Sequence, residues 1–221
     1  GRMGSPHDPK TVRLRQDLVA TYRASRPFES ARHQRTLLRH GPQHTFRLLT
    51  YNLLCHIHRP QFPYCSRESL KWAYRRERLI SEVEAYQADI CAFQEMDHYE
   101  KFFRAELDRL GYQSMYGSKR EDGHGDGICL AWNSARFVLL DSRVVSFAET
   151  MKHLPEAIPN LALLALLEDR RTGRKLVLAT THLYWHWEFD HLRAVQAQFL
   201  FESIMKWCRS LKLSDYELIV C

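Results

Sequence analysis

The sequence lacks several features that would assign a protein to a class at once. No apolar run approaches the roughly 20 residues of a membrane-spanning helix, so no membrane partner is expected. The 6 cysteines form no Cys-x-x-Cys pair, which argues against a zinc site or a thioredoxin-like motif. A Walker loop, a dinucleotide-binding fingerprint, a Ser-His-Asp order, internal repeats and low-complexity segments are absent as well.

The composition is that of a globular protein with a modest basic excess. A length of 221 residues favours one domain, and 45% hydrophobic with 26% charged residues is typical of the globular class. A formal net charge of +6 favours an acidic partner such as nucleic acid, although solubility alone also accounts for it. Several cysteines lie in apolar runs, where free cysteine behaves as a small buried hydrophobe. We therefore expect an intracellular protein, in the mitochondrion or cytoplasm, with the nucleus not excluded.

Three segments of different character follow one another along the chain. Residues 1–5 are interpreted as a cloning remnant, and residues 6–45 as a basic, irregular or partly helical arm. The arm is either the mature edge of an organelle-targeted protein or a solvated basic segment. Residues 46–221 carry the apolar patterns and are predicted to form the folded domain.

The apolar patterns predict many strands and few helices. Strands are expected at 46–54, 88–96, 112–117, 127–133, 137–147, 160–168, 175–185 and 216–221. Helices are expected from Ser66 to about Tyr86, after Asp97, and from Asp190 onwards. Because the middle strands have no helices between them, the pattern favours two sheets packed face to face with helices outside.

Polar residues stand at the ends of three predicted strands. Glu95 follows an otherwise apolar strand, where an unpaired carboxylate would be costly, and carboxylate oxygens are ligands for Mg²⁺. Asn52 can donate to a phosphate oxygen, and His182 can donate to a phosphoryl oxygen whose charge grows in the transition state. Taken singly, these residues also fit a helix cap, a turn and a core histidine. Together they predict a site that holds one divalent cation against a phosphate.

Two further segments are candidates for substrate contacts. Residues 184–187 (YWHW) form an aromatic patch in which Trp185 can stack a base, with core packing expected for at least one of its two tryptophans. Lys119 and Arg120 precede the Gly-rich stretch at 124–127, from which a basic pair can reach phosphates. An ordinary solvated loop is the alternative there.

The motifs, in this order, resemble a known family from about Phe46 to Cys221. They are LLTYNLL, ADICAFQEMDHYEKFF, GDGICLAWN, NLALLALLE and ATTHLYWHWEFDHLRAVQ. They look like the exonuclease–endonuclease–phosphatase superfamily. The Gln-Glu and Thr-His-Leu elements are shared by the whole superfamily. The Trp-His segment followed by Arg193-x-x-Gln196 is more typical of its deadenylase branch, which contains nocturnin, the Angel proteins, the carbon catabolite repressor deadenylases and the mitochondrial 2′-phosphodiesterase.

The resemblance implies a four-layer α/β/β/α sandwich and phosphodiester hydrolysis that depends on Mg²⁺, or on Mn²⁺. The activity it implies first is that of a 3′–5′ exoribonuclease on single-stranded, adenine-rich RNA, as in mRNA decay. The catalytic residues carried over are Asn52, Glu95 and His182, with Glu95 as the metal ligand. The substrate-binding residues carried over are Asn160 and, as softer assignments, Lys119, Arg120 and His186.

One departure from the family pattern leaves other functions open. In the family, the strand predicted at 216–221 leads into a Gly-Asp-x-Asn motif and a later Ser-Asp-His, and neither motif occurs in the 221 residues. The apolar final strand favours a piece, about half to two-thirds, of a complete enzyme. The alternative is a truncated, inactive homologue that binds RNA or protein. Within the enzyme class, a 2′,5′- or 2′,3′-cyclic phosphodiesterase or a 2′-phosphatase is a further alternative.

Overall fold

The computed structural model describes residues 45–119, 125–148, 160–186 and 188–221. The segments predicted at 1–5 and 6–45 lie outside these residues, except for Thr45. Residues 56–86 belong to one compact unit, and residues 46–55 together with 87–221 form another.

Within residues 56–86 of the first unit lie a short 3₁₀ helix, η2 (His56–Gln61), and the α-helix α3 (Trp72–Tyr86). The sequence predicted a helix from Ser66, but α3 begins only at Trp72. The difference arises because the Ser66 hydroxyl accepts a hydrogen bond from the Ser69 amide at 3.1 Å and so caps a separate turn before the helix. Helix α3 buries Leu79, Ile80 and Val83, and Val83 lies four and three positions after the other two, as expected for one face of a helix.

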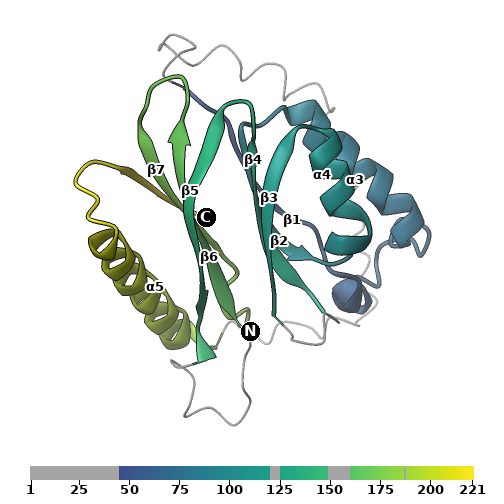
Figure 1. Cartoon of the computed structure of the whole chain (residues 1–221). Coiled ribbons are helices and arrows are strands. Elements are labelled where there is room, and N and C mark those ends of the chain that lie inside the picture. Colours follow the sequence, from purple (N-terminus) through teal and green to yellow (C-terminus); the bar gives the residue numbers. More distant parts are fainter. Residues whose placement is uncertain (1–44, 120–124, 149–159, 187) are drawn as a thin grey trace. The chain divides into compact units, whose positions relative to one another are not determined.

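The second unit contains two four-stranded sheets, which run side by side in Figure 1. The first has the order β1 (Leu48–Asn52), β2 (Ile90–Met96), β4 (Gly127–Asn133), β3 (Tyr112–Ser118). The second has the order β5 (Phe137–Ser146), β6 (Leu161–Asp169), β7 (Lys175–Thr181), β8 (Glu217–Val220). The pairs β1–β2 and β7–β8 are parallel, and the other neighbours are antiparallel.

These strands follow the predicted ones closely, with one clear exception. The strand predicted at 175–185 ends at Thr181. Beyond it, side chains of α5 replace a neighbouring strand as partners of the backbone. The Tyr184 amide donates to Gln196 Oε1 at 2.9 Å, and Arg193 Nη1 donates to the Tyr184 carbonyl at 3.2 Å. Because these side chains satisfy the backbone hydrogen-bonding groups of the segment, it does not have to pair with a neighbouring strand.

The core between the two sheets consists of alternate residues of their central strands, together with Phe137 at the start of β5. These residues are Ile90, Ala92, Ile128, Leu130, Trp132, Phe137, Leu161, Leu163, Ala165, Leu167, Leu176 and Leu178. Full burial of one such aliphatic side chain contributes about 1.5–3 kcal/mol, so this layer supplies a large share of the folding free energy. The inward faces of β2 and β7 are thereby defined.

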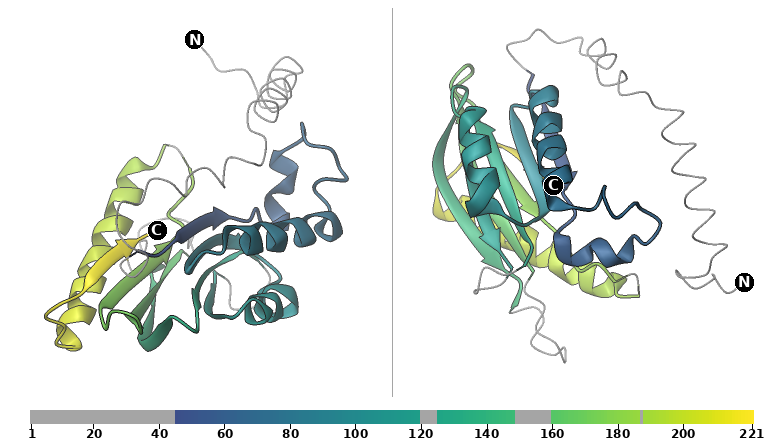
Figure 2. Two further views of the ribbon diagram at one scale, coloured as in Figure 1. Left: turned by 90° about the horizontal axis from the view of Figure 1, so that it is seen from above. Right: turned by 90° about the vertical axis from the view of Figure 1, so that its right-hand side faces the viewer.

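Helices cover the outward faces of both sheets. Helix α5 (Asp190–Ser210) packs on the β5–β8 sheet through Leu200, Ile204 and Trp207, and Figure 2 shows it along that face. The short helices η3 (Tyr99–Phe103) and α4 (Arg104–Arg109) follow β2. The Tyr99 ring stacks on Tyr116 of β3, with centroids 4.6 Å apart. The layers are thus α/β/β/α, which confirms the predicted fold class. In the described part of the chain, no helix has both the length and the apolarity to cross a membrane.

A close backbone approach where β4 begins gives a first prediction. A Cβ added at Gly127 would lie 2.4 Å from the Gly117 carbonyl oxygen and 2.5 Å from the Tyr116 hydroxyl. We expect Gly127→Ala to lower the free energy of unfolding, measured in urea, by about 1–3 kcal/mol. Gly117→Ala is the matched control, since its Cβ would meet the flexible ends of Leu161 and Leu163 at 2.7 and 3.0 Å. An equal or larger loss in the control would contradict the prediction.

The cysteines give a second prediction. None of the 6, all in the described part of the chain, forms a disulfide, and burial raises the pKa of Cys91 to about 12 and that of Cys129 well above its usual value. Because the thiolate is the nucleophile, both should resist Ellman's reagent in the native protein. Cys65 is partly exposed and should react first. Cys65→Ser should remove the fast phase, and modification of native Cys91, mapped by mass spectrometry, would disprove the prediction.

Candidate active site

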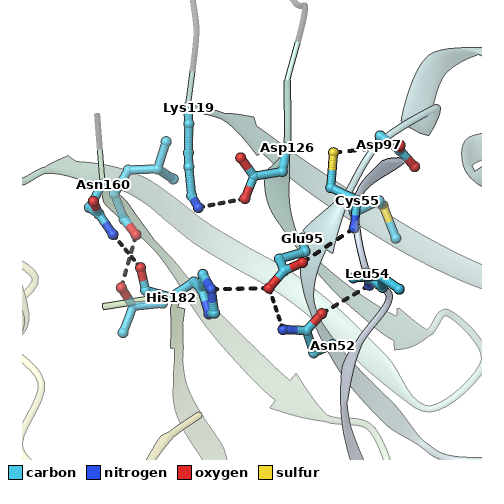
Figure 3. A network of polar contacts seen from close by, with 12 residues as sticks. Asn52, Leu54, Cys55, Glu95, Asp97, Lys119, Asp126, Asn160 and His182 are labelled. Atoms are coloured by element: carbon cyan, nitrogen blue, oxygen red, sulfur yellow. Dashed lines mark hydrogen bonds and ion pairs between the residues drawn. The ribbon is translucent and has the colours of Figure 1, made fainter. Parts of the chain in front are cut away.

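Three polar strand ends meet at one edge of the second unit. Asn52 is the last residue of β1, and it pairs in parallel register with Gln94, the residue before Glu95. His182 directly follows β7 of the other sheet. Figure 3 shows the side chains of Asn52, Glu95 and His182 turned toward one another. The structure thus brings together the three residues for which catalytic roles were expected.

An irregularity in β2 turns Glu95 toward this edge. Ile90 and Ala92 face the core between the sheets, so strict alternation would place Glu95 on the outward face. Glu95 instead has a φ of 51°, in the left-handed region, and the pairing of β2 with β4 shifts register between Phe93 and Met96. A residue other than glycine is uncommon in the left-handed region. β-Bulges often redirect a side chain beside an active site.

Hydrogen bonds hold the Glu95 carboxylate in place. Asn52 Nδ2 donates to Oε1 at 2.7 Å, and the Cys55 amide donates to Oε2 at 3.3 Å. His182 Nε2 lies 3.5 Å from the same Oε1. The Asn52 amide has a defined orientation, because its Oδ1 accepts from the Leu54 backbone amide at 2.9 Å and its nitrogen must then face the carboxylate.

The donor chemistry of this group fits a hard divalent cation. Glu95 supplies carboxylate oxygens, each of which can accept a hydrogen bond and still offer a lone pair, and its side chain is 14% exposed. Mg²⁺ commonly needs one or two carboxylates and completes its shell with water and substrate phosphate. The nearby Asp97 is buried, and its Oδ2 accepts a weak bond from the Cys55 thiol at 3.5 Å.

Asn160 supports the site from behind. It is buried just before β6, and its Nδ2 donates to the His182 carbonyl oxygen at 2.5 Å. This bond crosses from the start of β6 to the end of β7 and fixes the backbone from which the imidazole projects. Sequence reasoning expected Asn160 in a substrate contact, and the structure places it beside His182.

Lys119 has a partner that the sequence did not reveal. Its Nζ lies 2.5 Å from Asp126 Oδ2, and both side chains are largely buried. Figure 3 shows the pair at the same edge as Glu95 and His182. The one available signal was the position of Asp126 directly before Gly127, where β4 begins. Arg120 lies outside the described residues.

Tyr116 lines the outward side of this edge. Burial first, and then the negative charges of Asp126 and Asp97, raise the pKa of Tyr116 to about 12. The phenol therefore stays protonated at neutral pH, and it donates to the Met96 carbonyl at 3.3 Å. Tyr116 acts as a fixed hydrogen-bond donor to the backbone just after Glu95.

The aromatic segment after β7 lies at the surface. Trp185 is 70% exposed and does not pack in the core. Tyr184 and His186 stack with ring centroids 6.5 Å apart, and Arg193 Nη1 donates to the His186 carbonyl at 2.6 Å. The side chain of Trp187 lies outside the described residues. Trp185 thus stands on an anchored segment with its ring accessible.

Fold and site together define a class of protein: a four-layer α/β sandwich with a carboxylate, an amide and an imidazole gathered at its strand ends. The model of the Endonuclease/Exonuclease/phosphatase family matches residues 49–202. The chain belongs to this family.

Individual relatives narrow the resemblance. The chain is 31% identical over 183 residues to the CCR4-Not complex 3′-5′-exoribonuclease subunit Ccr4 of Emericella nidulans, and 30% identical to that of Aspergillus clavatus. Each alignment covers 72% of this chain and 27% of the relative. The chain thus spans about a quarter of the length of these relatives.

Solved structures agree with this placement. The human Nocturnin catalytic domain with bound sulfate matches with a TM-score of 0.64 and 28% identity, over 80% of this chain and 63% of that one. ANGEL2, a 2′,3′-cyclic phosphatase, matches in fold with a TM-score of 0.71 and 24% identity, over 80% of this chain and 52% of that one. The resemblance to the deadenylase branch, expected from the motifs, is confirmed.

Proposed function

We propose that the protein is a magnesium-dependent phosphodiesterase, and specifically a 3′–5′ exoribonuclease that shortens single-stranded, adenine-rich RNA. The observation that carries the proposal is the contact of Asn52 and His182 with the Glu95 carboxylate across two sheets, at 2.7 and 3.5 Å. The similarity to relatives named 3′-5′-exoribonuclease and the net charge of +6 support it.

Each of the three residues has a distinct role in this proposal. Glu95 holds the metal ion through its carboxylate, with Mn²⁺ as an alternative to Mg²⁺. Asn52 keeps that carboxylate oriented through its Nδ2 hydrogen bond. His182 directs Nε2 to the same place and donates to a non-bridging oxygen of the scissile phosphate, where negative charge increases in the transition state. The bound ion supplies Lewis-acid polarisation of the phosphate.

The substrate contacts proposed lie on either side of this centre. Lys119, held by Asp126, supplies positive charge for a phosphate of the RNA backbone. The exposed ring of Trp185 supplies a face on which a base can stack. Asn160 supports the site through its hydrogen bond to the His182 carbonyl oxygen. His186 supports it by stacking on the ring of Tyr184.

Base stacking on Trp185 gives a third prediction. Stacking is worth about 1–3 kcal/mol per base, so we expect Trp185→Ala to raise KM for RNA by roughly tenfold with kcat little changed. Phe201→Ala is the matched control, because it removes an exposed aromatic side chain from α5. Steady-state kinetics on a labelled RNA provide the measurement. Equal KM values for the two variants would remove Trp185 from the substrate path.

The proposed activity is tested with a 5′-labelled, adenine-rich RNA in magnesium and in EDTA. We expect stepwise shortening from the 3′ end in magnesium and intact RNA in EDTA. Parallel reactions with 2′,5′-linked oligoadenylate and with RNA ending in a 2′,3′-cyclic phosphate identify the linkage. Binding of the RNA without cleavage in any of these reactions would overturn the proposal in favour of a binding module.

A further inference from the structure

The two central residues of the site belong to different sheets. Glu95 lies on β2 and His182 follows β7, so their separation of 3.5 Å depends on how the sheets are stacked. The core between the sheets is apolar, and apolar packing is non-directional. A directional contact close to the site is therefore needed to fix the position of β2 relative to β7.

Gln94 supplies such a contact. It is 8% exposed and lies on the inward face of β2, two positions after Ala92. Its Nε2 lies 3.3 Å from Thr180 Oγ1 of β7, 3.3 Å from Thr50 Oγ1 of β1 and 3.2 Å from the Ala92 carbonyl. A carbonyl oxygen only accepts hydrogen bonds, so the Ala92 contact requires that the amide nitrogen points this way.

The partners of Gln94 stand directly behind the catalytic candidates. Thr180 is the inward-facing residue of β7 that precedes His182, and Thr50 is the corresponding residue of β1 before Asn52. Gln94 itself precedes Glu95. One side-chain amide thus links the three strands, two positions before Asn52 and His182 and one position before Glu95.

We infer that Gln94 is a positioning residue, whose bridge to Thr180 sets the distance between Glu95 and His182. The inference rests on the proposed function. Gln94 does not touch the substrate; it acts through the strands on either side. Because a misplacement of about 1 Å in an active site can cost roughly 100-fold in rate, loss of the bridge should lower turnover more than substrate affinity.

The central variant is Gln94→Met combined with Thr180→Val. Both substitutions keep approximate side-chain volume, and replacing Gln94 and Thr180 together leaves neither member of the inter-sheet pair without its partner, so the fold should be retained. We expect kcat to fall by roughly 10- to 100-fold, with KM changed less than about twofold and the urea midpoint close to that of the wild type. A role in stability alone would move the midpoint and leave kcat unchanged.

Two single variants serve as controls. Thr180→Ser keeps the hydroxyl and should keep kcat. Thr50→Val removes a hydroxyl from the same Gln94 amide, but within one sheet, and should leave kcat near the wild-type value. A loss in Thr50→Val as large as in the double variant would overturn the assignment to the inter-sheet bridge.

Wild type and Glu95→Gln are measured in parallel and report on the proposed function itself. If the wild type is active in magnesium and the double variant keeps its kcat, the inference fails and the function stands. If the wild type cleaves no RNA, the function fails, and a crystal structure of the double variant decides the inference. An unchanged separation of 3.5 Å between His182 Nε2 and Glu95 Oε1 overturns it, and a lengthened one supports it.

Discussion

Glu95→Gln should lower magnesium-dependent RNA cleavage by roughly 100- to 1,000-fold. The substitution removes the negative charge that is proposed to hold the ion. It keeps the size of the side chain and an oxygen that can accept the 2.7 Å bond from Asn52 Nδ2. The fold should therefore be retained, and the loss should appear in kcat at saturating RNA. The measurement is the initial rate over a series of magnesium concentrations, with the thermal midpoint of each protein.

Glu100→Gln is the matched control for this prediction. It removes the same charge from the next glutamate along the chain, which forms an exposed ion pair with Arg104 at 3.0 Å on the helix after β2. The control should cleave RNA at the wild-type rate. Full activity of Glu95→Gln, or unfolding of that variant, would exclude the proposed role of Glu95.

Arg136→Met should cause the largest loss of stability, about 3–5 kcal/mol of unfolding free energy. Arg136 is 3% exposed, and its guanidinium lies 3.2 Å from Asp89 Oδ1 and 2.9 Å from Asp169 Oδ2. Burial works against ionisation of Asp169, but hydrogen bonds from Arg136 and from the Arg171 amide hold the pKa of its carboxyl below the usual 3.8. Removing the cation therefore leaves the carboxylates of Asp89 and Asp169 without the guanidinium that they share.

An exposed ion pair in the same unit provides the comparison. Arg174 is 71% exposed and contacts Glu217 at 2.7 Å, so Arg174→Met should cost no more than about 1 kcal/mol. Urea denaturation of both variants gives the two values. Similar losses would show that the buried position of Arg136 is not the source of its effect.

Arg136 also explains how the far edge of the two sheets is joined. Asp89 directly precedes β2, and Asp169 is the last residue of β6 in the other sheet. The guanidinium therefore bridges the sheets, as Gln94 does beside the site. No local sequence pattern predicts this role, because a single Arg between two strands is also typical of a turn.

Much of the fold was readable from local patterns. The apolar strands, such as β6 (LALLALLED), are buried along nearly their whole length, and that burial requires cover on both faces. The errors fell where a side chain competed with regular structure. Ser66 caps its own turn, and the residues after Thr181 bond to Gln196 and Arg193. The bonds of Tyr184 reach residues 12 and 9 positions further along the chain, whereas the Ser66–Ser69 bond is local and competes with the helix start that Ser66 suggested.

The sequence by itself determined the sandwich class and the polar strand ends at Asn52, Glu95 and His182, because strand periodicity and a polar residue after an apolar run are local properties. The tertiary structure alone decided the partners of Lys119, Arg136 and Gln94. These pairings reach across the sheets or between strands; the Gln94–Thr180 contact joins residues 86 positions apart. Stacking and register of whole sheets set such contacts, and both are sums over many side chains rather than a property of any one segment.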